Sequence, residues 1–140
     1  MNLSSNVKIS QVVGPTATGT TTIDGTTLDM QGYEGVLFVG SIVSAAANNG
    51  IKAQQGQQAN LSDAADLAGS QVLSDGTKKQ FVLDIYKPQE RYVRCQVVRG
   101  TTTVIDSVWA VQYGAEKLPV VNTSAAIVDE THISPAEGVA

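Results

Sequence analysis

Two neighbouring stretches of the chain, residues 80–86 and 91–99, alternate apolar and polar side chains with a period of two. The apolar positions are Phe81, Leu83 and Ile85 in the first stretch and Val93, Cys95 and Val97 in the second. Successive side chains of a β-strand leave opposite faces of the pleat, so this pattern is typical of half-buried strands. Lys87-Pro88-Gln89-Glu90 lies between them, and its proline favours a turn. We therefore predict a hairpin over residues 80–99.

Further strands are predicted on both sides of this hairpin. Residues 35–43 are apolar on both faces, which indicates either a strand covered on two sides or a strand with one face in a sandwich and the other in an interface. The β-branched residues and Gly40 favour a strand over a buried helix. Residues 104–113 predict another well-covered strand, which would complete an antiparallel meander of three strands with the hairpin. Residues 7–13 predict a first strand, in an edge position, that ends at Gly14-Pro15.

Two short motifs predict tight turns. Asn48-Asn49-Gly50 favours the positive φ of a hairpin turn, so we expect residues 51–55 to return along residues 35–43. Asp24-Gly25 between threonine-rich flanks is a second hairpin-type signal.

One short helix is expected over residues 63–68, with Ser62 as its N-cap and Gly69 as its stop. The fold class predicted from these elements is all-β: an antiparallel β-sandwich or jelly-roll with this one short helix, in a single domain over residues 1–118. About eight short strands suit both a jelly-roll and an immunoglobulin-like sandwich.

Residues 119–140 have a different character. They contain no Lys, Arg or aromatic residue, and their aliphatic residues are spaced too loosely for a core strand. The sequence therefore predicts an extended C-terminal arm, which would be disordered alone or would lie on a neighbouring molecule.

Charge and cysteine content narrow the class of protein. The net charge of −4 argues against general nucleic-acid binding, which depends on phosphate neutralisation by Lys and Arg. No apolar stretch approaches the roughly 20 residues of a membrane span, and the N-terminus does not resemble a signal peptide. A single cysteine excludes an intrachain disulfide, which fits synthesis in a reducing cytoplasm. We therefore interpret Asn122-Thr123-Ser124, which matches the glycosylation acceptor pattern, as a chance match.

No catalytic, cofactor or metal site is expected. His132, the only histidine, lies in the arm, where no rigid partner would orient it. Cys95 alternates with Val93 and Val97 and is expected to pack in the core rather than to act as a nucleophile. There is no Cys/His cluster for zinc, and the loop carboxylates match no calcium-binding loop. The sequence thus predicts neither an enzyme nor a protein with a small-molecule substrate.

Positive charge gathers on the predicted hairpin, where Arg91, Arg94 and Arg99 suit either a solvated strand surface or a contact with a partner's carboxylates. Trp109 and Tyr113, with Tyr86 and Tyr92, suggest an aromatic sugar-binding platform as an alternative to ordinary core and interface packing. The residues predicted to bind a partner are, on the hairpin, Lys87, Arg91, Tyr92 and Arg94, and in the arm, Val120, Val121, Ile127 and Val128.

Five segments carry a resemblance to a known family: GYEGVLFVGSIV (32–43), ANNGIKAQQ (47–55), ADLAGSQV (65–72), LDIYKPQERYVRCQVVR (83–99) and AVQYGAEKLPV (110–120). In their order they resemble the small capsid cement, or decoration, proteins of tailed bacteriophages, in particular the jelly-roll type of short-tailed phages.

The resemblance implies a homodimeric jelly-roll, made in the host cytoplasm and carried on the outer capsid surface of the virion, where it clamps neighbouring subunits of the major capsid protein. It implies no catalytic residues. Two alternatives stay open: a receptor- or carbohydrate-binding β-sandwich of a phage virion, and a head–tail connector component.

Overall fold

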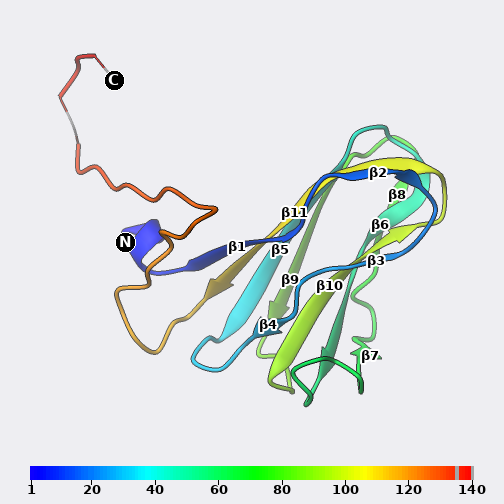
Figure 1. Cartoon of the computed structure of the whole chain (residues 1–140), viewed down its shortest axis with the longest axis horizontal. Coiled ribbons are helices and arrows are strands. Elements are labelled where there is room, and N and C mark those ends of the chain that lie inside the picture. The colour runs from blue at the N-terminus through cyan, green and yellow to red at the C-terminus, as the bar shows by residue number, and fades with distance from the viewer. Residues whose placement is uncertain (135, 140) are drawn as a thin grey trace.

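The computed structural model describes residues 1–134 and 136–139 and consists of two antiparallel β-sheets packed face to face (Figure 1). The only helical element among the described residues is the single-turn 3-10 helix η1 (Leu3–Ser5). The strands are β1 (Lys8–Val13), β2 (Thr16–Gly19), β3 (Ile23–Asp24), β4 (Leu28–Asp29), β5 (Gly35–Ile42), β6 (Ala47–Gly56), β7 (Ala65–Asp66), β8 (Val72–Asp75), β9 (Gln80–Tyr86), β10 (Tyr92–Arg99) and β11 (Thr103–Tyr113).

The strand order is that of a jelly-roll. The first sheet has the order β1-β11-β5-β9, with β2 also paired to β11. The second has the order β3-β10-β6-β7, with β4 also paired to β10 and β8 to β6. When β1 with β2, β3 with β4, and β7 with β8 are each treated as one interrupted strand, the chain passes from one sheet to the other at every connection except that from β6 to β7 and β8, which stay beside β6 in the second sheet. The predicted all-β sandwich is confirmed, and its topology is the double-sheet jelly-roll.

The predicted hairpin and meander are wrong. β9 pairs with β5 in the first sheet, whereas β10 pairs with β6 in the second, so the segment after β9 crosses between sheets at Lys87, which has a φ of 50°. β11 returns to the first sheet beside β5. For the same reason residues 51–55 pair with β10 and not with residues 35–43. Alternation specifies which face of a strand is buried, but it does not specify the neighbouring strand.

Neither predicted tight turn joins a hairpin. Asn48 has a φ of 63°, but it lies inside β6, where the register with β8 shifts between Ala47 and Gly50. This is a β-bulge. Gly25 interrupts the strand between β3 and β4, and its N–H donates to the carbonyl of Cys95 at 2.8 Å. A Cβ at Gly25 would lie 2.6 Å from that oxygen, so the close approach of the two backbones requires glycine.

The helix expected over residues 63–68 is not formed. The Asp63 carboxylate instead accepts hydrogen bonds from the N–H groups of Gln57 and Gln58, at 2.8 and 3.2 Å, and closes a loop. Ala65 and Asp66 form β7, which pairs with β6. Two turns of helix gain too few hydrogen bonds to offset nucleation, so the pairing with β6 prevails over local propensity.

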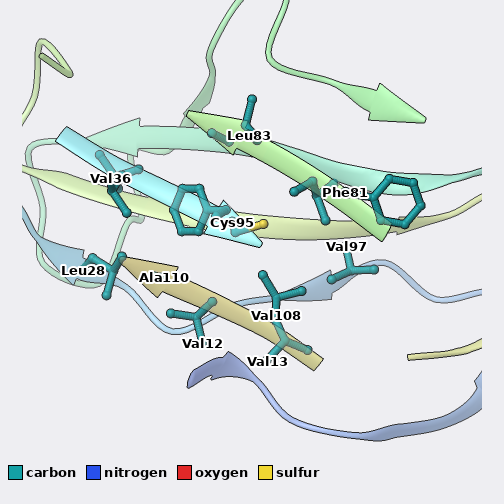
Figure 2. Packing of buried hydrophobic residues seen from close by; sticks show 14 of the residues in the cluster. Val12, Val13, Leu28, Val36, Phe81, Leu83, Cys95, Val97, Val108 and Ala110 are labelled. Carbon is teal, nitrogen blue, oxygen red and sulfur yellow. The ribbon is translucent and has the colours of Figure 1, made fainter. Parts of the chain in front are cut away.

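Inward-facing side chains of both sheets form one core, part of which Figure 2 shows. Val36 and Phe38 of β5 are fully buried, as are Val93 and Cys95 of β10. The core role predicted for Cys95 is confirmed, and burial raises the pKa of its thiol to about 12. Only the inner face of residues 35–43 is covered, because Val39 on the outer face remains 39% exposed.

The buried thiol makes stability depend on alkaline pH. The unfolded chain loses the Cys95 proton above about pH 9, whereas the folded chain retains it because its pKa is raised to about 12. Between these values the thiol should lower the free energy of unfolding by about 1.4 kcal/mol per pH unit. Urea unfolding between pH 9 and 10.5 measures this slope. The slope of the Cys95→Ala variant gives the contribution of all other titrating groups, which is subtracted. Equal slopes for both proteins would show that the thiol ionises in the folded state.

Candidate contact surfaces

The arginines predicted to meet a partner's carboxylates meet carboxylates of their own chain. Arg91 donates two hydrogen bonds to Asp29, at 2.9 and 2.7 Å, and this pairing holds the pKa of Asp29 below its usual value. Arg94 donates to the Gln54 side-chain oxygen at 2.8 Å and lies 3.1 Å from an Asp24 oxygen. Both positive charges are thus largely matched within the domain.

Arg99 is neither a solvated surface residue nor a free contact residue. It is 6% exposed, and its guanidinium donates to the backbone carbonyls of Thr21, Ala17 and Thr103 at 2.6, 2.9 and 3.3 Å. Arg99 therefore fastens the β2–β3 connection and the start of β11 to β10. Arg99 continues the inward-facing series of Val93, Cys95 and Val97, and the β2–β3 connection covers it.

Lys87 and Tyr92 each take part in a contact between a cation and an aromatic ring. The Lys87 ammonium lies 5.2 Å from the centre of the exposed Tyr86 ring, and the Arg91 guanidinium lies at the same distance from the Tyr92 ring. Lys87 and Arg91 also line an open hollow of about 540 Å³ between residues 30–34 and 87–91. Glu34 and Glu90 lie on the same walls. This hollow therefore presents both charges and does not form a basic patch.

The outer face of the second sheet is polar and internally bonded. Lys52 and Gln54 of β6 both bond the Asp66 carboxylate of β7, at 2.7 and 2.6 Å. Gln96 of β10 donates to Asp24 of β3, which also faces Arg94. Side chains from successive strands thus satisfy one another across this sheet.

The outer face of the first sheet is apolar at its centre. In one cross-strand row Trp109 of β11 is paired with Val39 of β5, which is paired with Val82 of β9. In the next row Val111 is paired with Leu37. Val39 and Val82 are 39% and 60% exposed, and the other three are half-buried. We call these outward side chains the apolar face: Leu37, Val39, Val82, Trp109 and Val111. The two-faced apolar pattern of residues 35–43 is its sequence signal.

The beginning of the arm is fastened to the N-terminal segment (Figure 1). Asn122 is 2% exposed; its side-chain oxygen accepts from the N–H of Ile9, and its amide donates to the carbonyls of Ser4 and Val7, each at 2.8 Å. The N–H of Val120 donates to the Ser5 carbonyl at 2.9 Å. The arm predicted from residue 119 is therefore bound to the domain through Asn122, a residue that the sequence indicated only as part of a chance glycosylation match.

Some of the remaining arm residues pack against the domain and others are exposed to solvent. Ile127 is half-buried and, with Trp109, lines a hollow of about 360 Å³ beside β1. Val120 is also half-buried, whereas Val121 and Val128 are 67% and 94% exposed. Ile133 is 90% exposed. The four predicted arm residues thus form two covered and two exposed positions.

The other candidate groups are dispersed. Trp109, Tyr113 and Tyr86 belong to strands of the first sheet, but Tyr92 belongs to the second, so the four aromatic residues do not form one platform. His132 lies 2.9 Å from the Glu130 carboxylate, and both are exposed. Among the described residues no cluster of three potential metal ligands is present. The described part of the chain also contains no helix with the length and apolar character of a membrane span.

No family model matches this chain, and no curated protein matches its sequence significantly.

Removing the Asn122 side chain should weaken the domain. Asn122→Ala removes the partner of the buried Val7 carbonyl and of the partly buried Ser4 carbonyl and Ile9 N–H, so we expect a loss of about 1–3 kcal/mol in the free energy of unfolding. Chemical denaturation measures this loss. Asn2→Ala, at an exposed asparagine of the same terminus, is the matched control and should change little. If the two variants were equally stable, the arm would not be fastened at Asn122.

Proposed function

We propose that this chain is a non-enzymatic structural protein of a bacteriophage virion, which binds the outer surface of the capsid and clamps neighbouring major capsid protein subunits. The observation that carries the proposal is the exposed arm on a closely packed jelly-roll domain. The arm presents Val121, Val128 and Ile133 to solvent. Exposed aliphatic side chains on an extended segment are typical of a strap that is covered by a partner.

The large exposed area of the chain supports the proposal that a partner covers part of it. The chain exposes 8181 Å². A compact monomer of 14.6 kDa exposes about 6,900 Å² by the usual scaling, which is about 1,300 Å² less. One side of a standard protein–protein interface buries about 800 Å². The surplus is therefore large enough for a specific contact once the arm is ordered on another molecule.

The resemblance to jelly-roll cement proteins supplies the identity of the partner, and the jelly-roll strand order agrees with it. Clamping of this kind depends on many weak contacts, since linkage of two copies and repetition over the shell raise the effective concentration. A protein that binds the assembled shell better than free subunits stabilises the shell by mass action.

The internal ion pairs change the expected contributions of the basic residues. Arg91 and Arg94 would have to exchange Asp29 and Asp24 for carboxylates of the capsid, so each should add little net affinity. Lys87 has no ion pair among the described residues and is the better basic contact.

Truncation after Ile127 tests the proposal, because it keeps Asn122 and its hydrogen bonds and removes the exposed part of the arm. Co-sedimentation with empty heads of the cognate phage measures binding. We expect the truncated chain to keep its unfolding midpoint and to bind heads at least about tenfold more weakly. Val128→Ser/Ile133→Ser in the full chain should reproduce part of this loss.

A chain that ends after Ser134 is the control for shortening the C-terminus in itself. It should bind almost as well as the full chain. Equal binding by the full chain and the chain ending at Ile127 would exclude the strap. Absence of any binding by the full chain would exclude the cement function.

A further inference from the structure

The carboxylates on the two outer faces of the sandwich differ in whether they form ion pairs. On the second sheet and its edges, Asp24, Asp29, Asp66 and Asp75 each lie within 3.1 Å of an Arg or Lys nitrogen. Beside the apolar face, Asp84 and Asp106 have no ion pair among the described residues. Their hydrogen bonds come from neutral hydroxyls.

These hydroxyls hold the two carboxylates at the border of the apolar face. Tyr113 donates to Asp84 at 2.7 Å, and Ser41 donates to Asp106 at 2.8 Å. Asp84 is paired with Leu37 in the β5–β9 register, so it lies directly beside the apolar side chains. Both hydroxyl donors leave the negative charge uncompensated, in contrast to the guanidinium and ammonium groups of the second sheet.

We propose that the outer face of β11, β5 and β9 binds a different protein. The contact surface of that partner is an apolar patch edged with Lys or Arg side chains. Burial of the apolar face would supply affinity, and basic side chains on the partner would replace the cations that Asp84 and Asp106 lack. This rests on the proposed function in one respect only, namely that the partner is then the major capsid protein of the shell.

A second copy is a poorer occupant of this surface. Two apolar faces related by a two-fold axis would bring Asp84 and Asp106 of one copy against the same face of the other. The cations nearest to these carboxylates along β9, Lys79 and Lys87, lie beyond its two ends and not within the face. A symmetric pair would therefore bury two or more like charges without partners, which disfavours it.

The test uses a defined probe that does not depend on capsids. Trp109, the only tryptophan, belongs to the apolar face, so its fluorescence reports on binding there. A short peptide of alternating Leu and Lys is titrated against the full chain, and a peptide of alternating Leu and Glu is the control. We expect saturable binding of the Leu-Lys peptide, weakened as salt rises, and no comparable binding of the Leu-Glu peptide.

Variants locate the binding. Val82→Ser should weaken binding of the Leu-Lys peptide about three- to tenfold, since it removes an exposed apolar side chain from the face without changing the charge. The matched control is Leu73→Ser, at an exposed apolar residue of β8 in the other sheet, which should leave binding unchanged. Asp84→Asn/Asp106→Asn should weaken binding about three- to tenfold at low salt and little at high salt. Its control, Asp66→Asn/Asp75→Asn, changes the net charge equally.

Each result supports or overturns the proposal. Equal binding of both peptides, or equal losses from Val82→Ser and Leu73→Ser, would overturn it. Wild-type self-association in sedimentation equilibrium that Val82→Ser weakens would also overturn it, because a second copy would then occupy the face. The same variants are co-sedimented with empty heads. Head binding that is unchanged by Val82→Ser overturns this inference alone, whereas peptide binding without head binding overturns the proposed function alone.

Discussion

The packing of two apolar inner faces against each other is the constraint on which the structure depends. Phe38 on β5 and Cys95 on β10 belong to different sheets, yet both are fully buried in one core. Each strand therefore needs only one apolar face, and the opposite face is free to vary. Every connection that carries the chain between the sheets preserves this arrangement. The interruption at Gly25 follows from the same closeness, since the backbones of β10 and the β3–β4 segment approach too tightly for a side chain.

The inward positions were predictable from the sequence because they depend on a local pattern. Phe81, Leu83, Val93 and Val97 all face the core as the alternation predicts. The pairing of strands was not predictable in this way, since alternation does not encode that β9 pairs with β5 in one sheet and β10 with β6 in the other. The helix expected over residues 63–68 failed for a related reason: the decisive partners of Asp63 lie several residues earlier, at Gln57 and Gln58. Local propensity lost to contacts made within the folded chain.

The candidate surface was predicted only in part, for reasons of charge pairing. Arg91 and Arg94 are outward-facing basic residues in the sequence, but the carboxylates of Asp29 and Asp24 come from strands that precede them by about 60–70 positions. Such partners become visible only in the folded protein. The apolar outer face of β5 was signalled by its two-faced composition, but the pairing of β5 with β9 and β11, which brings Val82 and Trp109 beside it, was not predicted. In the fold the predicted basic residues are thus paired internally, whereas the outer face of the first sheet is apolar and bordered by Asp84 and Asp106.

The anchoring of the arm through Asn122 has a mechanical consequence. A pull applied to the exposed part of the arm reaches Asn122 before it reaches the covalent connection to β11. The load therefore passes first through three hydrogen bonds to Ser4, Val7 and Ile9, and from there into β1, which is paired with β11 along one edge of its sheet. The N-terminal segment therefore takes up part of any force on the arm, so that β1 shares this force before β11 can separate from β5.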